Sequence, residues 1–393
     1  MRKGWEYKKL GEVTSFFRGL TYSGKDEVDK SNNIVLRSNN IDLSTNSLNF
    51  DELKFISDSI TIPQDKKLRK NSIFMCMSNG SKQHLGKVAF IEKEYPYAFG
   101  GFMGLIVPNE DKLVPKFTYY YFCSQKFKNY LSAIGNGANI NNIKYIDIAK
   151  DSIPLPPKST QLAIVSELDK INELIRLKKE QLKDFDNLAQ SLFYEMFGDP
   201  VENEKGWEVK KLGEIAKSAI GLTYKPENVT EELSGTVVLR SSNIQNSILD
   251  FNDIVRVNVL VKEDKMVNDG DILMCSRNGS FKLVGKVALI KGLKERMSYG
   301  AFMTIIRSPY NPYLFEYFKT PAFRQYLITG KTTTVNQITV KMLNNLTLPL
   351  PPLSHQRLFA QRIEQIEREK SEVQKSIQDL ETLLASRMQY WFE

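Results

Sequence analysis

Apolar residues recur at alternating spacings of three and four along two stretches, residues 159–197 and 354–393, neither of which contains a glycine or a proline. This pattern is typical of long amphipathic helices that pack along one coiled-coil seam. Lys178 and Lys370 interrupt the seam at positions that do not match, so they either fix the register or extend to solvent. The apolar seam positions are Leu168, Ile171, Ile175, Leu182, Phe185, Ala189, Leu192 and Met196, and Ile363, Ile366, Val373, Ile377, Leu380, Leu384 and Trp391.

The two predicted helices belong to one chain and should therefore pair with each other, in antiparallel orientation. Each stretch follows a Pro-Leu-Pro-Pro segment, residues 154–157 and 349–352, which favours a helix start with Ser159 and Ser354 as N-caps. At about 1.5 Å per residue, each helix would be roughly 57 Å long.

The residues that precede each long helix follow a different pattern. Short β-branched and aromatic runs such as Ile34-Val35-Leu36 alternate with Gly, Asn, Asp and Pro, which is typical of strands joined by turns. Helical patterns occur near 115–132 and 310–328. We predict an α+β fold with two mainly-β globules joined by two long antiparallel helices that form a coiled coil. The expected domains are the globules 1–158 and 206–353, the helices 159–198 and 354–393, and the linker 199–205.

Both halves of the chain carry the same sequence blocks in the same order, which indicates an internal duplication. The blocks 4–13, 19–22, 35–41, 79–81, 86–89 and 154–157 return as 206–215, 221–224, 238–244, 278–280, 285–288 and 349–352. Each helix leads back to the start of a unit, so the unit order is circular. A pseudo-two-fold body with the two chain ends close together is therefore expected.

Positive charge is concentrated in the predicted globules. Residues 1–158 carry 23 Lys and Arg against 16 Asp and Glu, a net charge of +7, and residues 206–353 carry 19 against 13, a net charge of +6. The helical stretches 159–197 and 354–393 carry −2 and −1. A polyphosphate partner selects such a basic surplus, although a merely basic protein shows it too.

The sequence offers little for catalysis or metal binding. The segment 80–88 resembles a phosphate-binding loop, but five residues instead of four separate its glycines, and a valine replaces the metal-binding hydroxyl. Two histidines and three cysteines, Cys76, Cys123 and Cys275, form no zinc pattern. We expect a non-catalytic protein without metal or cofactor. The sparse, odd set of cysteines and the lack of an apolar run of roughly 20 residues favour a soluble, cytoplasmic protein.

Two related basic globules on a helical spacer would suit duplex DNA, whose half-sites repeat with the helical turn of roughly 34 Å. Loops in each globule hold guanidinium, amide and hydroxyl groups, which contact base edges and phosphates. The candidate DNA-binding residues are Arg18, Tyr22, Arg37, Ser38, Asn39, Asn40, Ser78, Asn79, Lys82, Gln83, His84, Asn136, Asn139 and Asn141, and Tyr224, Lys225, Arg240, Ser241, Ser242, Asn243, Arg277, Asn278, Lys282, Lys331, Thr333, Asn336 and Gln337.

Comparison of the two copies suggests two kinds of role. Identical residues suit scaffold or phosphate contacts: Arg37 and Arg240, Asn79 and Asn278, Tyr22 and Tyr224, Asn141 and Asn336. Residues that differ in matched loops suit base recognition, because the two globules should recognise different base sequences. These are Asn39 against Ser242, Ser78 against Arg277, Gln83 against Lys282, and 136–139 against 331–334.

The layout resembles the specificity subunit of Type I restriction–modification enzymes. The block Leu36–Ile41, the Gly-Lys-Val-Ala blocks and the Pro-Leu-Pro-Pro segments before Gln161 and Gln356 carry the resemblance, which covers essentially the whole chain. It implies a split DNA target with one half-site per globule, and helices that dock methyltransferase subunits, two of them. Restriction motor-nuclease subunits are a further partner. S-adenosylmethionine and ATP would bind only to those partners.

The second globule departs from this pattern, because it lacks counterparts to some loop residues of the first, so base identities cannot be transferred. A different class of function also stays open, that of a two-headed coiled-coil adaptor that binds proteins without sequence-specific DNA binding. Binding to DNA that weakens steeply with salt would separate the two.

Overall fold

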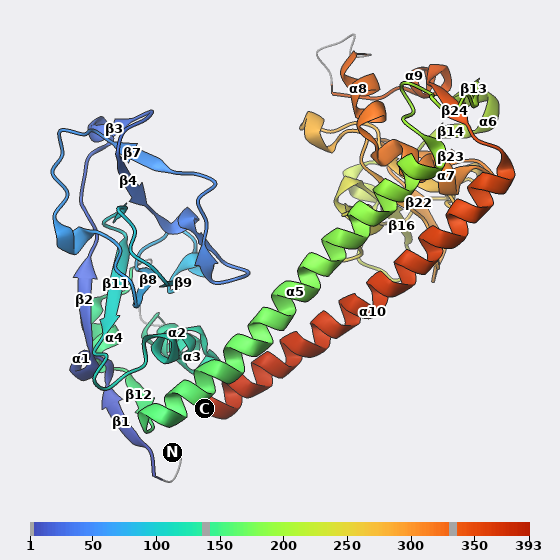
Figure 1. Ribbon diagram of the computed structural model, residues 1–393. Coiled ribbons are helices and arrows are strands. Elements are labelled where there is room, and N and C mark those ends of the chain that lie inside the picture. Colours follow the sequence, from blue (N-terminus) through green and yellow to red (C-terminus); the bar gives the residue numbers. More distant parts are fainter. Residues whose placement is uncertain (1–3, 136–141, 330–335) are drawn as a thin grey trace. The chain divides into compact units, whose positions relative to one another are not determined.

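The computed structural model describes residues 4–135, 142–329 and 336–393, and it divides into two compact units (Figure 1). Unit 1 comprises residues 1–179 and 375–393, and unit 2 comprises residues 180–374. Each unit therefore contains one predicted globule together with half of each long helix. The α+β class and the internal duplication predicted from the sequence are confirmed, since both units contain helices and sheets in the same order.

The two long helices are α5 (Lys158–Phe197) and α10 (Leu353–Phe392). Each begins directly after a proline whose carbonyl oxygen accepts the first helical hydrogen bond, from Gln161 to Pro157 at 3.0 Å and from Gln356 to Pro352 at 3.1 Å. The predicted N-caps were wrong by two residues, because Ser159 and Ser354 lie inside the first turn.

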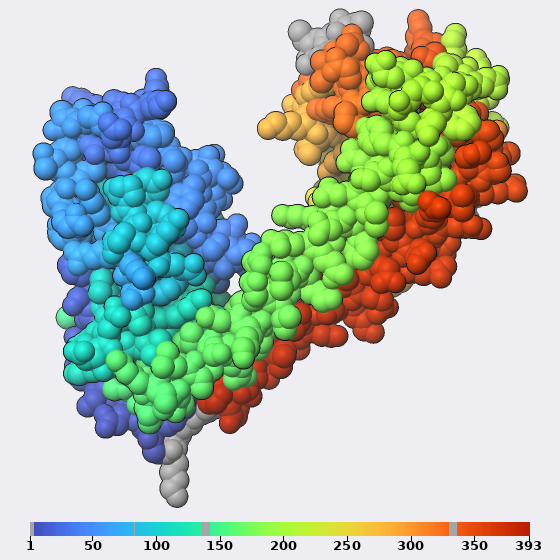
Figure 2. Space-filling model, viewed as in Figure 1, coloured from blue at the N-terminus to red at the C-terminus, as the bar shows by residue number. Residues whose placement is uncertain are grey.

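Within each unit, α5 and α10 run antiparallel, as predicted, and lie against each other (Figure 2). In unit 1, Lys179 pairs with Glu381 at 2.9 Å, and Glu167 pairs with Arg387. In unit 2, Lys370 pairs with Asp186 at 2.8 Å. Eight of the fifteen predicted seam residues are buried, and the other seven are partly buried. The buried ones are Leu168, Ile171, Ile175, Ala189, Leu192, Ile366, Val373 and Ile377.

The seam position of Lys370 is stabilised by two carboxylates. Its ammonium group donates to Asp186 at 2.8 Å and to Glu367 at 3.1 Å, while its side chain is only 16% exposed. Burial lowers the pKa of Lys370, but the hydrogen bonds to these carboxylates outweigh it, so the pKa is raised overall. Because one of these carboxylates, Asp186, lies on the facing helix, the mostly buried amine supports the register role rather than simple extension to solvent.

Each globule contains two four-stranded sheets, one with order β2-β11-β8-β9 and one with order β10-β4-β7-β3 in unit 1. Unit 2 repeats both orders as β14-β23-β20-β21 and β22-β16-β19-β15. The pairs β10–β4 and β22–β16 are parallel, and the other pairs are antiparallel. Small two-stranded sheets join β1 with β12, β5 with β6, β13 with β24 and β17 with β18.

The strands of unit 1 are β1 (Glu6–Lys9), β2 (Thr14–Arg18), β3 (Glu27–Val28), β4 (Asn33–Leu36), β5 (Ile41–Asp42), β6 (Ser47–Leu48), β7 (Lys54–Ile56), β8 (Ser72–Cys76), β9 (Val88–Ile91), β10 (Ala98–Phe99), β11 (Met103–Pro108) and β12 (Ser152–Leu155). Those of unit 2 are β13 (Glu208–Lys211), β14 (Lys217–Ile220), β15 (Val229–Thr230), β16 (Thr236–Leu239), β17 (Ile244–Gln245), β18 (Ile248–Leu249), β19 (Arg256–Val257), β20 (Ile272–Cys275), β21 (Val287–Leu289), β22 (Met297–Tyr299), β23 (Met303–Arg307) and β24 (Thr347–Leu350).

The helical patterns predicted in the globules are confirmed, each as two helices. They are α2 (Pro115–Cys123) with α3 (Gln125–Gly135), and α7 (Asn311–Lys319) with α8 (Pro321–Thr329). Four short helices were not predicted, since a single turn leaves no periodic signal: α1 (Leu10–Val13), α4 (Tyr145–Lys150), α6 (Leu212–Ile215) and α9 (Val340–Asn345).

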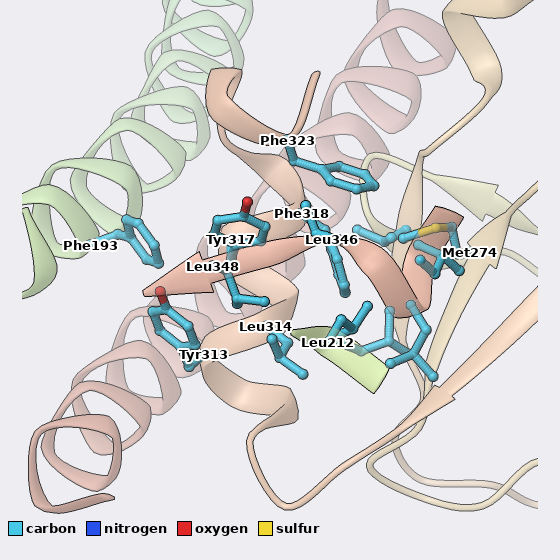
Figure 3. Packing of buried hydrophobic residues seen from close by; sticks show 14 of the residues in the cluster. Phe193, Leu212, Met274, Tyr313, Leu314, Tyr317, Phe318, Phe323, Leu346 and Leu348 are labelled. Atoms are coloured by element: carbon cyan, nitrogen blue, oxygen red, sulfur yellow. The ribbon is translucent and has the colours of Figure 1, made fainter. Parts of the chain in front are cut away.

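Aromatic residues anchor each globule to its half of the helix pair. In unit 2, Phe193 of α5 stacks on Tyr313 of α7 with ring centroids 5.5 Å apart (Figure 3). In unit 1, Phe392 at the end of α10 contacts Phe117 of α2 at 5.2 Å. Trp5 stacks on Trp391 at 6.3 Å, so the described residues near the two chain ends lie close together within unit 1, as the circular unit order predicts.

Candidate nucleic-acid interface

The loop after β4, and its counterpart after β16, is shaped by a buried asparagine. Asn40 accepts a hydrogen bond from the Arg37 backbone at 2.8 Å and donates to the carbonyl oxygens of Asn49 and Glu52 at 3.0 and 2.8 Å. Asn243 makes the same three contacts in unit 2. Both side chains are 1% exposed, so their amides are used inside the protein. Asn40 and Asn243 therefore leave the set of candidate DNA contacts.

A second matched contact joins this loop to the loop after β8. The Asn79 amide donates to the Ser38 hydroxyl at 3.0 Å, and Asn278 donates to Ser241 at 3.2 Å. This fits the scaffold role predicted for Asn79 and Asn278, and it shows that Ser38 and Ser241 take part in the same contact.

A lysine at matched positions of the two units also binds the end of the loop after β4 or β16. Lys87 is 8% exposed and donates to the Ile41 carbonyl oxygen at 2.9 Å, and Lys286 donates to that of Ile244 at 2.7 Å. Burial lowers the pKa of Lys87, although the neighbouring Cys76 and Asp42 raise it in part. We call the three residues of each unit the recognition frame: Asn40, Asn79 and Lys87 in unit 1, and Asn243, Asn278 and Lys286 in unit 2.

Asn79 of the recognition frame lines a hollow of about 820 Å³ in unit 1. Its walls bring together three loops that are distant in the sequence, residues 20–27, 37–39 and 78–80, with the turn 100–103. Six of the predicted contact residues line it: Tyr22, Arg37, Ser38, Asn39, Ser78 and Asn79. A concave site with a guanidinium, amides and hydroxyls has the donors and acceptors that base edges and phosphates require.

Two glycines explain why the Gly-Leu-Thr-Tyr block occurs in both units. A Cβ atom on Gly19 would lie 1.9 Å from the carbonyl oxygen of Gly100, and one on Gly221 would lie 2.2 Å from that of Tyr299. Only glycine permits this close approach of two backbones. The approach places Tyr22 beside the hollow, where burial raises the pKa of Tyr22 although Arg37 lowers it in part.

An exposed phenylalanine was missed by the sequence analysis. Phe102 lines the hollow with 73% of its surface exposed, and Phe302 occupies the matched turn of unit 2 with 58% exposed. The carbonyl oxygen of Phe102 accepts hydrogen bonds from Met77 and Ser78, and that of Phe302 from Ser276 and Arg277. Arg277 also lies over the Phe302 ring at 5.3 Å. The repeated Gly-Gly-Phe-Met and Gly-Ala-Phe-Met segments were the available signal.

The loop after β8, and its counterpart after β20, each meets a residue that precedes the next short helix, α4 or α9. Ser78 bridges to Asn142, and Arg277 bridges to Gln337. In unit 2, the Asn336 amide donates to the Gly279 carbonyl oxygen at 3.0 Å, which supports a scaffold role for Asn336. Five candidates lie outside the described residues, namely Asn136, Asn139, Asn141, Lys331 and Thr333, as does the side chain of Lys82.

The remaining candidates are spread around the two globules. Arg18 ends β2 with its guanidinium 6.0 Å from the Tyr145 ring and does not line the hollow. Lys282 lines a second hollow of about 650 Å³ beside α7 and α8. Lys225 pairs with Glu227 at 3.3 Å. The other four are Gln83, which is exposed, and His84, Tyr224 and Ser242, which are half-buried.

The matched arginines differ in their partners. Arg240 pairs with Asp253 at 2.8 Å, whereas no ion pair engages Arg37 among the residues that the structure describes. The Nε atoms of both arginines are buried without an acceptor in this part of the chain. Arg37 therefore has a guanidinium ready for a phosphate or a guanine.

The described ranges contain no group of three His, Cys, Asp or Glu side chains placed to hold a metal ion. No helix among these same residues is long and apolar enough to span a membrane. The thiols of Cys76 and Cys275 are buried, and burial raises their pKa.

Comparison with known proteins assigns the chain to a family. The family model of the Type I restriction modification DNA specificity domain matches twice, over residues 2–184 and 204–382. The chain belongs to this family. The two matches correspond to the two copies of the internal duplication, each with its own recognition frame.

Curated relatives match over most of the chain. The chain is 26% identical to the Type I restriction enzyme EcoKI specificity subunit of Escherichia coli K12, over 93% of this chain and 82% of the relative. It is 25% identical to the putative Type I restriction enzyme MjaX specificity subunit of Methanocaldococcus jannaschii, over 97% and 92%.

Solved structures share the fold. A chain from a structure of a Type I restriction–modification system matches with a TM-score of 0.61 at 20% identity, covering 99% of this chain and 97% of the other. The S subunit from M. genitalium matches with a TM-score of 0.52 at 15% identity, covering 100% and 98%.

Proposed function

We propose that this chain is the specificity subunit of a Type I restriction–modification assembly and that each unit reads one half of a bipartite DNA target. One observation carries the proposal. The same recognition frame occurs in both units, while the side chains displayed around it differ, as in Asn39 against Ser242 and Ser78 against Arg277. Two units that share one scaffold but present different side chains are suited to recognise two different half-sites.

Methyl transfer, and any DNA cleavage, would then belong to partner subunits, which would also bind S-adenosylmethionine and ATP. Two methyltransferase subunits, one per unit, fit the internal duplication, and motor-nuclease subunits would join them in a restricting assembly. Apolar residues on the long helices outside the seam support a docking role, because exposed leucines on a helix favour a protein partner. They are Leu162, Leu174, Leu177 and Leu188 on α5, and Leu353, Leu358 and Leu383 on α10.

Exchange of a globule tests the assignment of one half-site to one unit. Residues 1–158 are replaced by the equivalent domain of a relative, and the chain is expressed with its methyltransferase partner. Methylome sequencing should then report a target in which one half-site is new and the other is unchanged. A target in which both half-sites change would contradict the proposal.

Salt dependence separates this function from the adaptor alternative. DNA affinity of the assembled complex should fall steeply with salt, with a log–log slope of about −0.9 per phosphate contact. Shallow dependence and equal affinity for all sequences would favour the adaptor.

A further inference from the structure

A carboxylate occupies the same place beside the recognition frame in both units. The backbone carbonyl oxygen of Glu52 accepts from Asn40 at 2.8 Å, and that of Asp253 accepts from Asn243 at 3.0 Å. Both acidic residues are exposed at the loop where DNA would bind, and Glu52 lines the hollow. A negative charge here repels phosphates, so a general DNA-binding surface would be expected to lack it.

Each carboxylate accepts a hydrogen bond from a side chain of the loop after β4 or β16. In unit 1, the Asn39 amide donates to Glu52 Oε2 at 3.2 Å. In unit 2, Arg240 Nη2 donates to Asp253 Oδ2 at 2.8 Å, with the two side chains 36% and 64% exposed. The partner differs between the units, but the place of the acid does not.

These contacts leave defined groups for a base. An asparagine that gives one amide hydrogen to Glu52 keeps its carbonyl oxygen and its second hydrogen, the pair that recognises adenine in the major groove. An arginine that gives one Nη2 hydrogen to Asp253 keeps further donors, which guanine requires. The Asp253 charge also reduces the attraction of Arg240 to phosphates, which is independent of sequence.

We propose that Glu52 and Asp253 are specificity-determining positioning residues, which fix Asn39 toward an adenine and Arg240 toward a guanine of their half-sites. This inference rests on the proposed DNA-reading function and assigns a base class to one residue in each unit.

The test uses the full chain assembled with its methyltransferase partner. Methylome sequencing of the wild-type assembly first defines the target, and Asp253→Asn and Glu52→Gln are then compared with it. Affinity is measured for the target duplex, for duplexes with single base changes and for a scrambled duplex at several salt concentrations. Asp29→Asn and Glu231→Gln are the matched controls, since they remove one exposed carboxylate from unit 1 and from unit 2.

Asp253→Asn should lower discrimination at one guanine position by about 5- to 150-fold, the range of one bidentate base contact, and only in the half-site of unit 2. Affinity for the scrambled duplex should rise, with a salt slope steeper by about 1 because Arg240 gains a phosphate contact. Glu52→Gln should relax one adenine position in the half-site of unit 1. Asp253→Glu should restore discrimination, which a purely structural defect would not allow.

Unchanged discrimination in both variants, or equal changes in the controls, would overturn the inference while leaving the proposed function intact. A wild-type assembly that binds target and scrambled duplexes equally would instead overturn the proposed function, and this inference with it. The exposed ion pair contributes little to stability, so the melting temperature of Asp253→Asn should shift by no more than about 4 °C.

Discussion

The two units share strand order and recognition frame, but the side chains that join their elements to the long helices differ in part. In unit 1, Glu167 of α5 pairs with Arg387 and accepts from the Trp391 indole at 3.0 Å. At the matched positions of unit 2, 195 residues earlier in the sequence, stand Leu192 and Met196. The position that matches Glu167 is Arg362, so the charged and indole partners of the polar contact in unit 1 are replaced by apolar residues in unit 2.

The contact between globule and helix shows the same contrast. Tyr120 of α2 donates to Asp169 at 2.5 Å and accepts from Asn172 at 3.2 Å. Unit 1 also has a ring contact, of Phe392 with Phe117, but unit 2 has a larger cluster of rings. In this cluster Phe193 and Phe197 of α5 meet Tyr313 and Phe359. Duplication has kept the backbone arrangement while the side chains diverged, so the two units should respond differently to the same kind of perturbation.

The largest difference should follow from removal of a ring. Phe193→Ala should destabilise unit 2 by about 3–5 kcal/mol, because it leaves a cavity among buried aromatics. Hydrogen exchange followed by mass spectrometry should show loss of protection in unit 2 before unit 1. Leu188→Ala, an exposed position on the same helix, is the control and should change stability by less than about 0.5 kcal/mol. Equal loss of protection in both units would contradict the comparison.

A smaller effect is expected for the polar anchor of unit 1. Tyr120→Phe should cost about 1–2 kcal/mol, because it removes a hydrogen bond to a carboxylate. Denaturant unfolding of this variant, of Asp169→Asn and of the double variant forms a double-mutant cycle. Strictly additive effects would show that the hydroxyl and the carboxylate are not coupled.

The smallest effect should appear as a pH dependence. The hydrogen bond from Arg387 lowers the pKa of Glu167; partial burial opposes it and the Trp391 indole adds to it. Since the folded pKa is depressed, the contribution to stability is present above the ordinary glutamate pKa and is lost as pH falls through the folded value. At pH 7, the free energy of unfolding of the wild type should exceed that of Glu167→Gln by at most about 1 kcal/mol, and this difference should vanish in acid. A difference that is constant with pH would exclude this origin.

The regular features of the molecule were predictable from the sequence, because they follow a period or a repeat. The seam from Leu168 to Leu384 and the duplication belong to this class. The orientation of polar loop residues was not predictable. Asn39 and Asn40 are neighbours of one residue type, yet Asn40 is buried by contacts with Asn49 and Glu52 while Asn39 faces outward.

Long-range partners also escaped the sequence analysis. Asn79 lies 41 residues from the serine that it binds, and no local pattern reports such a contact. Phe102 was overlooked because an aromatic residue next to a strand is usually part of the core. Its exposure depends on the tight turn of residues 100–103, which only the fold reveals.

The recognition frame has a consequence for how new specificities arise. Asn40 and Lys87 bind backbone carbonyl oxygens, so the shape of the loop depends little on the side chains displayed between them. Substitution of Asn39, or of Ser242 in the other unit, can change the groups offered to DNA while the chain keeps folding. The residues that determine the fold of the loop are therefore separate from those that determine DNA sequence specificity. A lineage that carries such a chain can acquire new target sequences by point mutation, with few intermediates lost to misfolding.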